Sequence, residues 1–122
     1  MTSAQTSLFD TPSNIAWCDK WREKNENEYQ ALVEWTRADF KRGGRGSGKM
    51  ALYWEMLRSP HIRRTLANLY PSWLHHERFL LPNDKRADMA RYIMWHNFDL
   101  RGAFDIRKRP CETQAEFDGY LN

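Results

Sequence analysis

The feature that most constrains the fold is a largely apolar stripe in residues 28–42. Five side chains recur there at intervals of three or four positions: Tyr29, Leu32, Val33, Thr36 and Phe40. This spacing places them on one face of an α-helix. The run ends at Gly43 and Gly44, and glycine commonly follows a helix C-terminus. The stripe therefore predicts an amphipathic helix whose apolar face other elements must cover.

Further helices are expected on both sides of this one. A short first helix begins near Ser13 and Asn14, which can cap a helix start, and the polar run 23–27 interrupts it. Proline at positions 60 and 71, together with the turn-like residues 82–84, delimits the later ones. Their expected ranges are 50–58, 61–70 and 84–97.

Two short strands are predicted in the second half of the chain. Residues 78–81 are apolar and follow a break, and residues 103–108 alternate Phe104 and Ile106 with charged side chains, the period of a strand. The order helix, helix, strand, helix, strand is that of a winged helix, in which paired strands form a wing. The expected fold is therefore mainly α with a small β-wing, a single winged-helix-like domain.

The length of 122 residues leaves room for one modest core. We expect a disordered N-terminal tail at residues 1–13, a helical basic domain at 14–110 and an acidic C-terminal tail at 111–122, with room for one helical turn around Phe117 and Tyr120. No apolar run reaches membrane-spanning length, and the first residues do not resemble a signal peptide, so a cytoplasmic protein is expected.

Positive charge is concentrated in the middle of the chain. Residues 1–40 carry 4 basic and 7 acidic side chains, residues 41–110 carry 15 and 6, and residues 111–122 carry none and 3. Clustered Lys and Arg favour binding to phosphates through counterion release. A solvated helical face would give the same count, so both interpretations stay open.

Seven basic residues are the candidates for DNA contact. Three lie on the helix 84–97, interpreted as the recognition helix, two in the adjoining wing and two in the loop that precedes residue 50. They are Arg45, Lys49, Lys85, Arg86, Arg91, Arg107 and Lys108. Ion pairs of these residues with neighbours such as Asp88 are the alternative.

No pattern predicts catalysis. Gly43, Gly48 and Lys49 satisfy most of a phosphate-binding loop, but Met50 stands where a hydroxyl should hold magnesium. The adjacent His75 and His76 would point in different directions on a strand or a helix. The two cysteines, Cys18 and Cys111, lack metal-type spacing. We therefore expect no enzyme, no metal site, no cofactor and no disulfide.

The N-terminal residues Gln5-Thr6-Ser7-Leu8-Phe9 resemble the short peptide with which bacterial polymerases, repair proteins and replication regulators bind the sliding clamp. The resemblance implies that Gln5 forms hydrogen bonds, that Ser7 fills a small polar position and that Leu8 and Phe9 enter an apolar pocket. Thr6 replaces the commoner Leu, which should weaken binding. The alternative is that Leu8 and Phe9 fold back on the domain as a hydrophobic strap.

A second resemblance concerns the domain itself. Residues 48–58, 79–83, 89–92 and 102–107 are similar to stretches of small, uncharacterised phage and prophage proteins. The two resemblances, taken with the basic central region, predict a phage or mobile-element accessory protein that binds the host sliding clamp through its N-terminal peptide and DNA through its basic domain. The alternative is a non-enzymatic inhibitor whose basic or aromatic face binds a host replication or defence protein.

Overall fold

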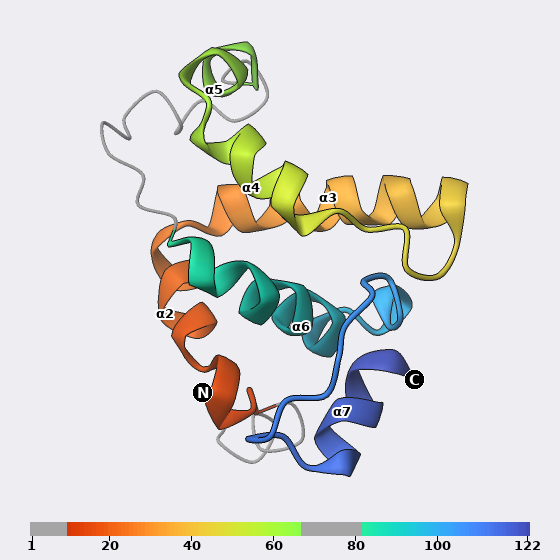
Figure 1. Ribbon diagram of the computed structural model, residues 1–122. Coiled ribbons are helices and arrows are strands. Elements are labelled where there is room, and N and C mark those ends of the chain that lie inside the picture. Colours follow the sequence, from red (N-terminus) through yellow and green to blue (C-terminus); the bar gives the residue numbers. More distant parts are fainter. Residues whose placement is uncertain (1–9, 67–81) are drawn as a thin grey trace.

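Helices dominate the part of the chain that the computed structural model describes, residues 10–66 and 82–122 (Figure 1). The mainly α fold class is thereby confirmed, and no residue in these two ranges belongs to a strand. The elements in chain order are η1 (Ser13–Ile15), α2 (Trp17–Lys24), α3 (Glu26–Gly43), α4 (Met50–Arg58), α5 (Pro60–Leu66), η3 (Asn83–Lys85), α6 (Arg86–His96), η4 (Phe98–Leu100) and α7 (Gln114–Leu121).

Helix α3 forms as its apolar stripe predicts. Tyr29, Leu32, Val33 and Thr36 are buried, and Phe40 packs half-buried against the same core. Gly44 follows the helix with a φ of 75°, a conformation that glycine adopts readily, and its N–H donates to the carbonyl of Phe40.

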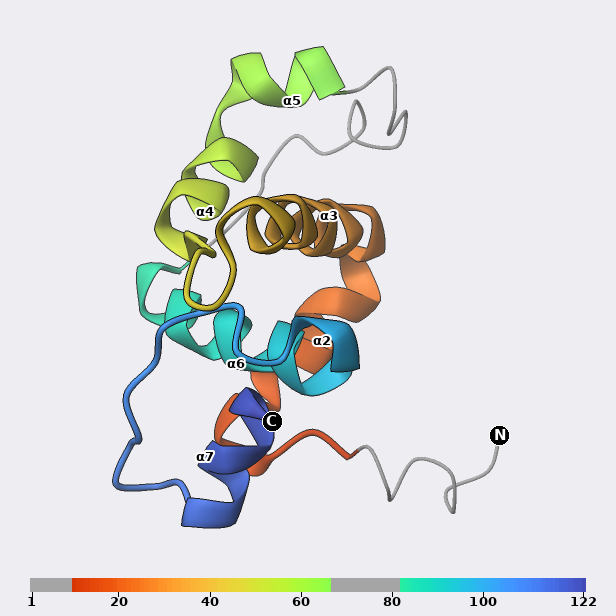
Figure 2. The same cartoon turned by 90° about the vertical axis from the view of Figure 1, so that its right-hand side faces the viewer.

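Helix α6 is the centre of the core. It packs against α2, α4 and α7, and Figures 1 and 2 show it enclosed between them. Residues 88–94 are all buried, so apart from its two ends α6 has no exposed face. The helix forms where it was predicted, but its interpretation as a groove-entering recognition helix is wrong, because entry into a groove requires an exposed face.

The strand predicted over residues 103–108 is also wrong. This segment is extended, with Phe104 buried and Ile106 half-buried, which explains the alternating pattern. One of its backbone hydrogen bonds joins it to a loop: the Gly48 N–H donates to the Ala103 carbonyl at 2.9 Å. A Cβ at Gly48 would lie 2.7 Å from the Phe104 ring, so the close approach depends on glycine. The other predicted strand, 78–81, lies outside the described residues.

The C-terminal segment belongs to the folded domain and is not a tail. Thr113 and Glu116 form a reciprocal capping box at the start of α7. Near the end of α7, Tyr120 is fully buried, with its ring 5.6 Å from that of Trp95 on α6. Helix α5, by contrast, contacts α4 and extends away from the core in both ribbon views.

The last residues of the expected N-terminal tail are attached to the end of α6. Pro12 is buried, the Trp95 indole N–H donates to the Asp10 carbonyl at 3.0 Å, and Thr11 Oγ1 lies 2.8 Å from His96 Nε2. The peptide residues Gln5, Ser7, Leu8 and Phe9 lie outside the described residues, as do His75 and His76.

Both cysteines are free thiols, Cys18 buried and Cys111 exposed. Among the described helices, none combines the length and the apolar character needed to cross a bilayer.

Candidate nucleic-acid interface

A surface groove of about 620 Å³ lies between the first turns of α4 and α6 and the segment 104–109. The start of α6, beginning with η3, supplies one wall, and the extended segment supplies another. Apolar residues that line the groove include Met50, Ala90, Phe104 and Ile106. This is a depression in which a ligand could contact three parts of the chain at once.

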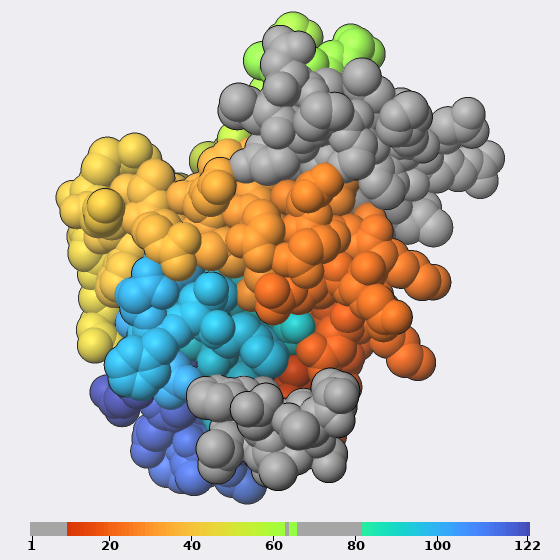
Figure 3. All heavy atoms as spheres, turned by 180° about the vertical axis from the view of Figure 1, so that it is seen from behind, coloured from red at the N-terminus to blue at the C-terminus, as the bar shows by residue number. Residues whose placement is uncertain are grey.

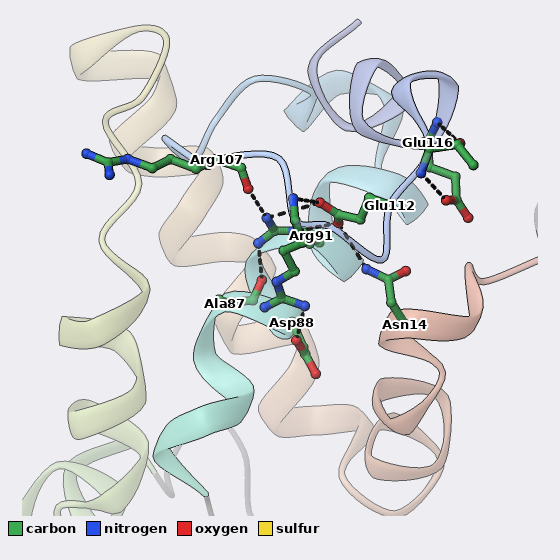
Figure 4. A network of polar contacts seen from close by, with 9 residues as sticks. Asn14, Ala87, Asp88, Arg91, Arg107, Glu112 and Glu116 are labelled. Carbon is green, nitrogen blue, oxygen red and sulfur yellow. Dashed lines mark hydrogen bonds and ion pairs between the residues drawn. The ribbon is translucent and has the colours of Figure 1, made fainter.

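Three of the predicted DNA-binding residues line this groove: Arg86, Arg91 and Arg107. Arg91 is buried and is treated below, which leaves Arg86 and Arg107 as the candidates for ligand contact. Arg86 Nε donates to the Asn83 carbonyl at 3.3 Å, and the Arg107 side chain extends away from the internal polar network (Figure 4). Within the described part of the chain neither forms an ion pair. No carboxylate among the described residues neutralises either guanidinium, although Asp84 and Asp105 also line the groove.

Three more predicted residues lie around the groove without lining it. Arg45 lines a neighbouring depression of about 430 Å³ that shares Phe104, Asp105 and Ile106 with the groove. Lys49 lines a third depression beside Met50, and Lys108 is exposed next to Arg107. None of the three forms an ion pair among the residues described.

The loop at residues 44–49 reaches this face through backbone hydrogen bonds. The Gly46 N–H donates to the Gly102 carbonyl at 3.0 Å, in addition to the bond from Gly48 to Ala103. Arg45 Nη1 donates to the Leu121 carbonyl at 3.2 Å, which ties the loop to the end of α7. Long-range bonds thus bring together basic residues that are about 60 positions apart in sequence.

Arg91 also lines the groove, but its guanidinium is engaged inside the protein, and its prediction as a DNA-binding residue is corrected. Its side chain is 3% exposed, and its Nε lies 2.6 Å from Oε2 of Glu112, whose side chain is 0% exposed. Its Nη2 donates to the Arg107 carbonyl at 2.5 Å (Figure 4). A guanidinium so enclosed cannot reach a phosphate, so Arg91 is a structural residue.

Glu112 is the centre of the surrounding polar network. Its carboxylate also accepts hydrogen bonds from Asn14 Nδ2 at 2.9 Å and from the Arg109 backbone N–H at 2.7 Å. Burial acts to raise the pKa of Glu112, but the bonds from Arg91 and Arg109 outweigh it, and the pKa is lowered. The network joins η1, α6 and the segment before α7.

Lys85 lies between the surface and this network. Its Nζ is 3.7 Å from Asp88 Oδ2 and 5.6 Å from the centre of the Trp17 ring. Asp88 also pairs with Arg109 Nη1 at 2.6 Å. The ion pair with Asp88 that was considered as an alternative does form, and it leaves Lys85 partly neutralised.

Sequence reasoning missed Glu112, because nothing in the spacing shows that it contacts Arg91, 21 positions earlier. It also missed two apolar side chains on the surface, Phe98 at 79% and Leu52 at 53% exposure. In the described ranges, no three His, Cys, Asp or Glu side chains cluster so that they could hold a metal ion.

Comparison of the chain with protein-family models, with curated proteins and with solved structures finds no match.

Proposed function

We propose that this chain is a phage or mobile-element accessory protein that binds a bacterial sliding clamp through residues 5–9 and DNA through the groove lined by Arg86 and Arg107. It acts by binding and not by catalysis. The observation that carries the DNA part is the meeting in one groove of two arginines, from different elements, that have no carboxylate partner in the described structure. Arg45, Lys49 and Lys108 extend the positive surface, and Lys85 contributes less.

The chemistry of the groove suits a phosphate backbone. Arginine presents several N–H donors in a planar fork, and the first turn of α6 adds the positive end of a helix dipole beside Arg86. Most hydrogen bonds between proteins and DNA go to phosphates and sugars. The winged-helix-like form of the domain stays a prediction, without the strand expected at residues 103–108, and this groove does not depend on it.

The clamp part of the proposal is supported by the peptide sequence. Gln5 and Ser7 supply polar contacts, and Leu8 and Phe9 supply the two apolar side chains of a linear anchor. The apolar side chains of such a peptide become buried when a partner provides the pocket, and this burial contributes binding energy.

DNA binding is tested by fluorescence anisotropy of a labelled duplex over a range of salt concentrations. Wild type should bind with a steep salt dependence, and Arg86→Ala combined with Arg107→Ala should weaken binding and reduce the salt slope by up to about two. The control combines Lys20→Ala with Lys24→Ala, exposed residues on α2 that do not line the groove. An equal effect of the control would mean that net charge, and not the groove, attracts DNA.

Clamp binding is tested by calorimetry with a purified bacterial sliding clamp. Leu8→Ala combined with Phe9→Ala should abolish binding, whereas Thr6→Leu, which restores the commoner residue of the motif, should tighten it. Wild type that fails to bind the clamp refutes this part of the proposal.

The second candidate function is inhibition of a host replication or defence protein through the basic or aromatic face. The observation that favours it is the exposed Phe98, an unusual position for a phenylalanine. Absence of DNA binding even at low salt, together with capture of an acidic host protein, would support this candidate over the first.

A further inference from the structure

Phe98 stands out on the described surface, because 79% of this side chain is exposed. It begins η4, the short turn directly after α6. Exposed aromatic side chains of this size commonly serve as anchors in protein interfaces. Phe98 is therefore a candidate anchor for a partner protein.

The backbone that carries Phe98 is fixed on two sides. The Asp99 carboxylate accepts a hydrogen bond from Arg37 Nε on α3 at 2.8 Å. Arg101 donates to the carbonyls of Met94 and Trp95 at 3.1 and 3.2 Å. Phe98 is therefore presented from an ordered turn, so little conformational entropy is lost when it is covered.

Phe98, Arg101 and Trp95 form one surface, here called the aromatic patch. The Arg101 guanidinium lies 5.3 Å from the centre of the Phe98 ring and 5.4 Å from that of the Trp95 ring. On the face shown in Figure 3, the light-blue surface of this part of the chain lies between α3 and α7. Aromatic residues and arginine are the types most enriched among residues that dominate binding energy.

Asp10 and Thr11, which directly follow the proposed clamp-binding peptide in sequence, lie at the edge of this patch. The Trp95 indole that faces Arg101 also donates to the Asp10 carbonyl, and Thr11 is bound to His96 beside it. One residue spans at most about 3.6 Å of chain, so chain connectivity limits the Cα atoms of Leu8 and Phe9 to within about 10 Å of that anchored carbonyl. A protein that takes Leu8 and Phe9 into a pocket is therefore held close to the aromatic patch.

We infer that the aromatic patch is a second contact with the same partner, the sliding clamp, and binds the surface beside the pocket that holds the peptide. This inference rests on the proposed function. The short tether from Phe9 to Asp10 favours this occupant over a second copy of the chain, since the clamp is brought to the patch by the peptide itself. Phe98 then adds affinity and fixes the orientation of the domain on the clamp.

The test is calorimetry of the full chain with a purified bacterial sliding clamp. Phe98→Ala should weaken binding by about 10-fold or more, the range of an aromatic interface anchor. Leu52→Ala, which removes the other large exposed apolar side chain, on α4, should leave affinity unchanged. Thermal unfolding of both variants verifies that they fold.

A flexible insertion provides the second arm. Six Gly and Ser residues placed between Phe9 and Asp10 uncouple the peptide from the patch. The insertion should therefore weaken binding to the clamp. In the chain that carries the insertion, Phe98→Ala should reduce clamp affinity by a smaller factor than in the native chain.

The outcomes separate the two proposals. If wild type binds, Leu8→Ala with Phe9→Ala abolishes binding and Phe98→Ala binds as tightly as wild type, the second contact is refuted and the clamp peptide stands. Equal weakening by Phe98→Ala and Leu52→Ala refutes the second contact as well. If wild type does not bind the clamp at all, the proposed function fails and this inference fails with it.

Discussion

Arg91 and Glu112 illustrate how a buried ion pair organises a small core. The two side chains are almost fully buried, and each has further hydrogen bonds that satisfy its remaining donors or acceptors. Breaking such a pair from one side leaves an uncompensated buried charge, which costs more than the intact pair contributes.

Arg91→Met should therefore lower the free energy of unfolding by about 3–5 kcal/mol. The matched control is Arg22→Met, which breaks the more exposed pair with Glu26 and should cost about 1 kcal/mol or less. Urea denaturation followed by tryptophan fluorescence measures both. Adding Glu112→Leu to Arg91→Met should recover part of the loss, and equal costs in the two single variants would contradict a stabilising role for the buried pair.

His96 makes stability depend on pH. Its pKa is lowered below the ordinary value of 6.5, because burial, together with the nearby Arg22 and Arg101, outweighs the opposite effect of Asp19. A group whose pKa is lower in the folded state contributes stability that is present above its unfolded pKa and is lost as pH falls through the folded pKa. The melting temperature of wild type should therefore fall as pH drops from about 7.5 to about 5, and His96→Gln should show a weaker fall. Identical pH profiles would mean that His96 is not responsible.

The candidate site could be predicted in part at the level of single residues. Arg86 and Arg107 were chosen by charge and neighbourhood, and they do face one groove. Arg91 was chosen by the same criteria and is buried, because its partner Glu112 comes from a segment that composition alone classed as a tail. Residue type indicates charge, whereas burial depends on contacts between distant segments.

Among the elements, helices with clear apolar periodicity were predictable. α3 and α4 form where they were predicted, because apolar residues that repeat every three and four positions share one face only in an α-helix. Residues 103–108 show that an alternating apolar and charged pattern fits two structures. A strand in a sheet is one, and an extended segment that buries alternate side chains without pairing in a sheet is the other. For α7, the Thr113 and Glu116 spacing was a usable signal of a helix start that composition obscured.

Removal of α7 tests its place in the core. A chain ending at Cys111 loses Glu112 and Tyr120, so Arg91 keeps a buried charge without its carboxylate and Trp95 loses its ring contact. We expect loss of cooperative thermal unfolding in this variant. Thr113→Ala, which removes the cap and keeps the helix, should cost about 1 kcal/mol. A truncated chain with the melting behaviour of wild type would mean that residues 112–122 do not contribute to the folded core.

At the scale of the whole molecule, α6 separates the two proposed binding sites. Arg86 and the groove lie at its N-terminal end, and Trp95 and His96, which hold Asp10 and Thr11, lie at its C-terminal end. Eleven residues of helix span about 16 Å. Because α6 is buried between its ends, it acts as a rigid spacer between the peptide and the groove.

This separation predicts that the chain binds the clamp and DNA at the same time. Calorimetric titration with the clamp in the presence of saturating short duplex should give an affinity within about 2-fold of that without DNA, since sites with no shared contacts are nearly independent. Arg86→Ala combined with Arg107→Ala should leave clamp affinity unchanged while weakening DNA binding, and Leu8→Ala combined with Phe9→Ala should do the reverse. Displacement of the clamp by DNA would contradict this arrangement, because it would mean that the two ligands share one surface of the domain.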